Sequence, residues 1–139
     1  MRITAQHLDR KIISVLILAG SLFLSGCTVV PVYNIVDAPV PTKKANLKSI
    51  KTAILRATSA TGWRAKETSP GIITANYLQK SSIATIAITY SAKTFSIQLK
   101  EAKQLEFNGV TIHRKYNKWI MRLDKKIVNQ LRMLDHELD

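Results

Sequence analysis

The sequence is poor in cysteine, in acidic residues and in the short motifs that mark many catalytic sites. Its 139 residues include a single cysteine, Cys27, which excludes an internal disulfide framework, a four-cysteine zinc site and a CxxC redox pair. No glycine-rich phosphate loop, HExxH or GxSxG string is present. Nine acidic residues stand against 21 lysines and arginines, which gives a formal net charge of +12. The sequence therefore predicts no catalytic residue and no cofactor.

A basic segment followed by an apolar run opens the chain. Residues 1–11 carry Arg2, Arg10 and Lys11, and residues 12–24 (IISVLILAGSLFL) are almost wholly apolar. Thirteen helical residues span about 20 Å, which is short of the roughly 30 Å hydrocarbon core of a bilayer. This length favours a secretory signal peptide over an uncleaved membrane anchor, which is the alternative. We predict that residues 1–26 are a cleaved signal peptide.

The residues after the apolar run predict lipid attachment. Leu24-Ser25-Gly26-Cys27 resembles the lipobox of bacterial lipoproteins. The resemblance implies acylation of Cys27 and cleavage after Gly26; a free or buried cysteine beside an ordinary cleavage site is the alternative. In Gram-negative lipoproteins an aspartate after the cysteine usually retains the product in the inner membrane. Thr28 occupies that position here, which implies the outer membrane, on its periplasmic side, if the host is Gram-negative.

The next segment separates the expected lipid site from the rest of the chain. Residues 28–44 contain three prolines, which disfavour regular structure, and 17 extended residues reach at most about 60 Å. Their many valines are unlike a Gly/Ser linker. A free tether and an edge strand packed on the domain, where proline is tolerated, are both open interpretations. We assign residues 27–44 to the lipidated N-terminus and tether, and residues 45–139 to one periplasmic domain.

Hydrophobic periodicity predicts a helix at each end of this domain. Residues 46–61 and 112–135 both repeat apolar side chains at steps of three and four. In the first segment these are Leu47, Ile50, Ile54 and Ala57, and in the second they are Tyr116, Ile120, Leu123, Ile127, Leu131 and Leu134. Each pattern predicts a helix that buries one face.

Alternation predicts a sheet between the two helices. Apolar and polar residues alternate in 73–77, 84–90 and 95–99, and a fourth, weaker strand is expected near 63–68. Asn108-Gly109 fits a hairpin turn between 105–107 and 110–112, but we favour a loop into the last helix. The predicted fold is therefore α+β: a three- to four-stranded antiparallel meander with the N-terminal and C-terminal helices packed on one face.

Three short motifs in this order resemble a family of small bacterial lipoproteins. They are Gly62-Trp63, Pro70-Gly71-Ile72-Ile73, and Ile112-His113 followed by Tyr116-Asn117 and Trp119. The resemblance covers residues 46–131 and implies no catalytic role. The order of elements is also similar to the helix-grip domains of the outer-membrane assembly lipoproteins, a likeness of fold alone.

The last helix holds the candidate site residues. We expect His113, Tyr116 and Asn117 to lie on one helix face. They could form a polar recognition patch, or His113 could act as a general base, but core packing of Tyr116 and hydrogen bonds to the preceding loop explain them more simply. A second candidate is a ridge of basic residues that could bind a partner, and an ordinary solvated helix face is the simpler explanation of this ridge. Trp119 would lie beside the ridge, either at its rim or in the core. The ridge residues are Arg114, Lys118, Arg122, Lys125 and Lys126.

These features predict a non-catalytic structural or binding module anchored to a membrane by its N-terminal lipid. The expected partners of its basic face are anionic lipid headgroups, lipopolysaccharide phosphates or an acidic protein. A nucleic acid is a poor partner for a secreted, lipid-anchored domain. No metal site is predicted, because His136 among terminal carboxylates lacks the three or four defined ligands that zinc requires. The rival hypothesis is an accessory subunit of an envelope assembly or secretion complex.

Overall fold

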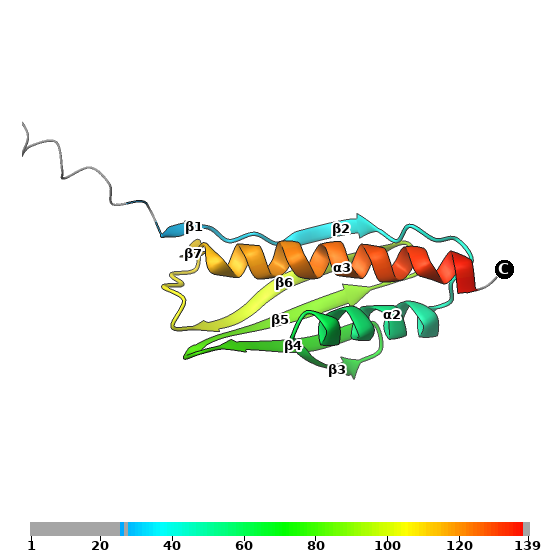
Figure 1. Ribbon diagram of the computed structural model, residues 1–139, viewed down its shortest axis with the longest axis horizontal. Coiled ribbons are helices and arrows are strands. Elements are labelled where there is room, and N and C mark those ends of the chain that lie inside the picture. Colours follow the sequence, from blue (N-terminus) through cyan, green and yellow to red (C-terminus); the bar gives the residue numbers. More distant parts are fainter. Residues whose placement is uncertain (1–25, 27, 138–139) are drawn as a thin grey trace, which may run out of the picture.

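The computed structural model describes Gly26 and residues 28–137 as an α+β protein (Figure 1). Within these residues the elements are β1 (Val29–Pro31), β2 (Ile35–Pro39), α2 (Leu47–Ala60), β3 (Arg64–Ser69), β4 (Ile72–Gln79), β5 (Ser82–Tyr90), β6 (Thr94–Lys103), β7 (Thr111–His113) and α3 (Lys115–Glu137). Cys27 and residues 1–25 of the predicted signal peptide lie outside the described residues. No helix in the described part is long and apolar enough to cross a bilayer.

Five strands form one antiparallel sheet in the order β2-β6-β5-β4-β3. The predicted meander is confirmed as β3 to β6, including the weaker strand near residue 64. β2 adds a fifth strand at the β6 edge, and β1 pairs with β7 in a separate two-stranded sheet. The structure therefore has more strands than the three to four that we predicted, because residues at the start of the chain pair with residues far along it.

The segment 28–44 contains the two additional strands. Ile35 pairs with Ile97, and Ala38 pairs with Phe95, with a bulge between these pairs. At the bulge Asp37 has a φ of 49°, and its backbone N–H donates to the Ser96 hydroxyl at 2.9 Å. Of the two open interpretations, the structure has the packed edge strand, and the five-stranded sheet begins before residue 45.

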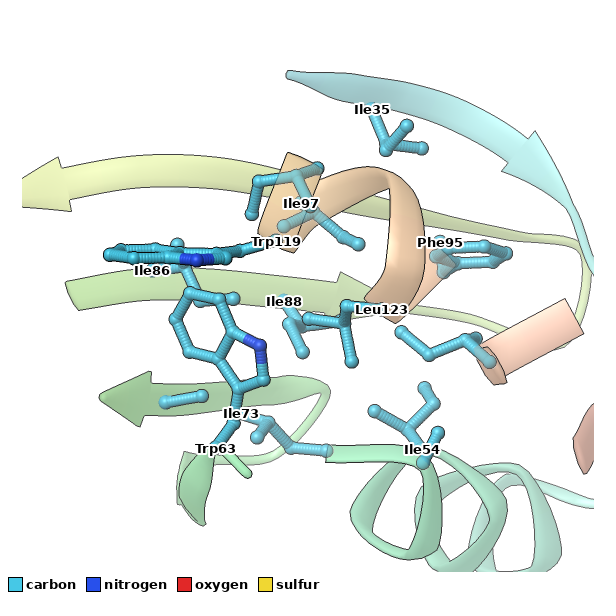
Figure 2. Packing of buried hydrophobic residues seen from close by; sticks show 14 of the residues in the cluster. Ile35, Ile54, Trp63, Ile73, Ile86, Ile88, Phe95, Ile97, Trp119 and Leu123 are labelled. Atoms are coloured by element: carbon cyan, nitrogen blue, oxygen red, sulfur yellow. The ribbon is translucent and has the colours of Figure 1, made fainter. Parts of the chain in front are cut away.

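Both helices cover the same face of the sheet. Figure 2 shows side chains of the central strands, such as Ile86 and Ile88, facing Leu123 of α3 and Ile54 of α2. All six apolar residues predicted to line α3 are buried. In α2 three of the four predicted residues are buried, but Leu47 is 54% exposed because it is the first residue of the helix, next to the N-cap Asn46.

The residues between β6 and α3 form a loop that is held by hydrogen bonds between its own residues. The His113 N–H donates to the Leu105 carbonyl at 2.8 Å. The Asn108 side-chain oxygen accepts from the backbone N–H groups of Val110 and Thr111, at 3.0 and 2.8 Å. We expected a loop at residues 105–107, and they do not form a strand. The short strand β7 was not predicted from the sequence, because its partner is the distant strand β1.

Candidate functional site: the exposed face of α3 and the end near residue 28

The solvent side of α3, together with Arg114 just before the helix begins, carries a line of exposed side chains at helical spacing. We call this line the α3 stripe; it consists of Arg114, Lys118, Met121, Lys125, Asn129 and Arg132. Among the described residues, the side chains of its four cations make no ion pair or hydrogen bond. Asp124 is the one acidic residue between positions 112 and 132; it is half-buried off the stripe, where desolvation raises its pKa. All the charged residues of the stripe are therefore basic.

Two of the five predicted ridge residues do not lie on this stripe. The Arg122 guanidinium donates to the Thr61 carbonyl at 3.2 Å and to the Tyr77 hydroxyl at 3.1 Å. Its central carbon also lies 5.9 Å from the centre of the Tyr77 ring, in cation–π range. Lys126, one helical turn further on, is half-buried. The predicted cations therefore do not form one surface: Arg114, Lys118 and Lys125 face solvent together, and Arg132 joins them.

The aromatic residues of the sequence motifs form a packed cluster. The Tyr77 ring lies between Trp63, at a centroid distance of 5.1 Å, and Trp119, at 4.6 Å. Trp119 is 5% exposed, so it belongs to the core and not to the rim of a binding surface. Gly62 has a φ of 87°, and a Cβ there would lie 3.1 Å from the Tyr77 ring. The Gly-Trp motif is thus explained by packing.

The predicted polar patch does not form on one helix face, because His113 is the last residue of β7 and α3 begins at Lys115. Its three residues have separate roles. Tyr116 is fully buried, its hydroxyl has no hydrogen-bond partner in the described part of the chain, and burial raises its pKa. Asn117 joins α3 to the N-terminal strands, since its amide donates to the Pro31 carbonyl at 2.9 Å and accepts from the Tyr33 N–H at 3.0 Å. The His113 ring nitrogen Nδ1 accepts from the Lys115 N–H at 3.2 Å. These contacts are structural.

A carboxylate and two neighbouring polar groups join α2 to the sheet. The Lys51 ammonium lies 2.8 Å from the Glu67 carboxylate, and the Tyr90 hydroxyl donates to that carboxylate at 2.6 Å. The hydrogen bond from Lys51 and then that from Tyr90 lower the pKa of Glu67. Burial first, and the hydrogen bond to Glu67 second, raise the pKa of Tyr90 to about 12. The cluster holds an ionised carboxylate in place and offers no base of near-neutral pKa.

No group of three or more His, Cys, Asp or Glu side chains in the described residues is placed to hold a metal ion. Asp135, next to His136, accepts a hydrogen bond from the Thr42 hydroxyl, which joins the end of α3 to the segment before α2. Asp139 lies outside the described residues.

One end of the molecule gathers the residues nearest in sequence to Cys27. The Thr28 carbonyl accepts from the Arg114 N–H at 2.8 Å, and the Thr28 hydroxyl lies 3.5 Å from the Glu106 carboxylate. An open depression of about 560 Å³ lies beside these contacts, and its lining includes Glu106, Phe107 and His113. Sequence reasoning missed this end altogether, because it is assembled from segments that lie far apart in the chain.

The turn between β4 and β5 belongs to the same end. The Ser82 hydroxyl donates to the Gln104 carbonyl at 2.9 Å, and the Lys115 ammonium donates to the Ser82 hydroxyl at 2.6 Å. Figure 1 shows β1, β7, the loop that follows β6 and the β4–β5 turn together, opposite the C-terminal end of α3. We call this region, comprising residues 28–30, 78–83 and 103–115, the anchor end.

Comparison with protein-family models, curated proteins and solved structures gives no match for this chain. The class that the structure defines is α+β, with an antiparallel sheet covered on one face by two helices. The likeness of the short motifs to small bacterial lipoproteins stays a prediction.

Proposed function

We propose that the chain is a bacterial lipoprotein, acylated at Cys27 and held on the periplasmic face of an outer membrane, whose folded domain is a non-catalytic binding module. The order of basic segment, apolar run and lipobox on the sole cysteine supports the anchor. Two or more acyl chains would make this anchoring lasting. The likeness of the domain to helix-grip folds is part of the same proposal.

The α3 stripe is the surface that we propose for binding, and an anionic surface is the ligand that its chemistry fits. The observation that carries this proposal is the set of four exposed cations with no partner among the described side chains, spread over about 27 Å of helix. A basic residue near an anionic membrane contributes about 1 kcal/mol. The anionic groups could be headgroup phosphates, including those of lipopolysaccharide, or the carboxylates of an acidic protein.

Charge reversal on the stripe tests the proposal. The test protein is residues 27–139 with Cys27→Ser, mixed with vesicles of phosphatidylethanolamine and phosphatidylglycerol and, separately, with an acidic polypeptide such as polyglutamate. The parent protein is expected to bind one of these two anionic ligands at low salt. We expect the variant Lys118→Glu/Lys125→Glu/Arg132→Glu to lose this binding. Whether the parent protein binds the vesicles or the polypeptide more tightly identifies the source of the anionic groups.

A matched control separates the stripe from net charge. The variant Arg64→Glu/Lys66→Glu/Lys100→Glu changes the formal charge equally, but its three residues are exposed on the sheet. We expect this variant to retain most of the binding. Equal losses in both variants would show that binding follows total charge, and the stripe would then not be the binding site.

The accessory-subunit role is the second candidate, and Met121 is the observation that favours it. This side chain is 51% exposed at the middle of the stripe, between Lys118 and Lys125. Methionine is enriched at protein–protein interfaces, so an exposed methionine in this stripe favours contact with a protein. Cross-linking from position 121 in envelopes tests this role: a discrete product that survives high salt, and that is absent in the stripe variant, would support it.

A further inference from the structure

We propose that the anchor end rests directly on the bilayer, with Phe107 and Val110 in the interfacial layer, so that α3 extends away from the membrane. This inference rests on the proposed acylation of Cys27. It goes further by assigning the orientation of the domain, the residues that contact lipid, and the side from which the α3 stripe is reached.

The described residues leave no free tether between the proposed lipid site and the domain. Backbone hydrogen bonds attach the chain from its first residue after Cys27: the Thr28 carbonyl accepts from Arg114, β1 pairs with β7, and the Val32 N–H donates to the Val110 carbonyl at 3.0 Å. Consecutive Cα atoms are about 3.8 Å apart. Because Thr28 follows the acylated residue directly in the sequence and is fixed at the anchor end, acylation would bring this end close to the bilayer.

The anchor end is rich in exposed apolar side chains. It holds five of the eleven large apolar side chains that are exposed in the described residues: Val29, Leu78, Ile83, Phe107 and Val110. Val110 is 72% exposed and Phe107 is 39% exposed, and both lie in the loop between β6 and β7. Exposed apolar groups gathered on one part of a surface indicate a contact with a partner or a membrane.

The charges of the anchor end complement an anionic membrane. Lys80, Lys103 and Arg114 are exposed there, and their side chains would lie at headgroup level when Phe107 and Val110 reach the interface. Lys103 also pairs with Glu101, which lies 3.3 Å from its ammonium just outside this region, and Glu106 is the one acidic residue within the anchor end. Apolar side chains surrounded by cations form the amphipathic surface that binds at the bilayer interface.

The direction of α3 then follows from the fold. The helix begins at Lys115 in the anchor end and continues for 23 residues, or about 35 Å, toward the opposite end of the molecule (Figure 1). Standing on the anchor end, the domain holds most of the α3 stripe at the side, away from the bilayer. The stripe would then meet an acidic protein in the compartment, and Arg114 is the one stripe cation close to the headgroups.

The sole cysteine of the chain makes this orientation measurable. When Cys27 is acylated it has no free thiol, so a second cysteine can be spin-labelled alone. We would reconstitute the acylated chain in vesicles of phosphatidylethanolamine and phosphatidylglycerol, with Val110→Cys, Met121→Cys or Leu47→Cys. The accessibility of each label to oxygen and to a nickel chelate reports its depth. All three positions are exposed, so the labels should leave the core intact.

The expected result is a label at position 110 that favours oxygen, as at the bilayer interface, and labels at 121 and 47 that favour the nickel chelate, as in water. Water-like values at all three positions in an acylated chain would overturn the proposed docking while leaving the anchor in place. Interfacial values at both 110 and 121 would show a domain lying on its side, which also overturns it. A chain without acyl groups by mass spectrometry, absent from the vesicles, would refute the proposed function itself.

A second variant tests the role of the apolar side chains. With the label at position 110, Phe107→Asp should move the label toward its water-like value. The matched control is Val36→Asp, since Val36 is also exposed, at 68%, but lies on β2 outside the anchor end. We expect the control to leave the label at the interface. An unchanged label in Phe107→Asp would exclude Phe107 from the lipid contact.

Discussion

Arg122 and Lys125 are both exposed cations of α3, yet the structure predicts opposite consequences of removing them. The Arg122 guanidinium links three elements: it lies on α3, donates to the Thr61 carbonyl at the end of α2, and contacts Tyr77 of β4. The Lys125 side chain has no hydrogen bond or ion pair in the described part of the protein. We expect Arg122→Ala to affect folding and Lys125→Ala to affect binding.

The size of the folding effect follows from the contacts that are lost. A hydrogen bond contributes about 0.5–1.5 kcal/mol net, and an exposed cation–π contact about 0.5–1 kcal/mol. Because Arg122 is partly solvated, we expect Arg122→Ala to lower the free energy of unfolding by about 1–2 kcal/mol. For a domain of this size, with an entropy of unfolding of about 2.1 cal/mol/K per residue, 1 kcal/mol corresponds to roughly 4 °C in Tm. Lys125→Ala should change the free energy of unfolding by no more than about 0.5 kcal/mol.

Urea denaturation monitored by circular dichroism measures this difference in the free energy of unfolding. Both substitutions are made in residues 27–139 with Cys27→Ser. The same two variants are then compared in the binding assay at low salt. We expect Arg122→Ala to retain binding at temperatures where it is folded, and Lys125→Ala to weaken it. Equal stabilities of the two variants, or a larger loss for Lys125→Ala, would refute the assignment of Arg122 to packing.

Three further changes test other features. Tyr116→Phe should stabilise the protein by about 1 kcal/mol in urea denaturation, because it removes a buried hydroxyl without a described partner; a loss of stability would contradict this. Gly62→Ala should lower the Tm more than Gly109→Ala: both have positive φ, but a Cβ meets the Tyr77 ring only at Gly62. Asp124→Asn should raise the Tm at pH 7, since burial raises the pKa of Asp124 and its charged form is less stable in the folded state; this gain should shrink as the pH falls through that pKa and vanish below about pH 4.

Local hydrophobic periodicity was sufficient to predict the helices and the central strands. The six apolar positions of α3 are buried because a helix packed on a sheet buries one continuous face. Alternation was a weaker guide in β6. There Thr85 pairs with Glu101 and Ile86 pairs with Leu99, so Lys100 is an extra residue that shifts the alternation. A pattern of period two cannot locate such a bulge.

The N-terminal strands could not be predicted from local sequence. β1 pairs with β7 across more than eighty residues, and each of these strands has only three residues. Their pairing is supported by contacts that no periodicity reveals, such as the two hydrogen bonds that Asn117 makes to Pro31 and Tyr33. The polar motif around Asn117 was visible in the sequence, but its role in holding the first strands depends on which segment lies opposite.

The spacing of cations along a helix also does not show which of them are free to bind a partner. Spacing placed Arg122 beside Lys118 and Lys125, but whether a cation is free depends on what the adjacent elements present to it, here a carbonyl at the end of α2 and a ring of β4. Next to the first residue of α3, the backbone N–H of Arg114 donates to the Thr28 carbonyl. An extended segment of 17 residues could have held the domain up to about 60 Å from the lipid site, but this attachment prevents such an extension. If Cys27 is acylated as proposed, the distance from the bilayer at which this protein can meet a partner is set by the length of α3, about 35 Å. Inserting flexible residues between Cys27 and Thr28 should therefore extend that distance without altering the fold.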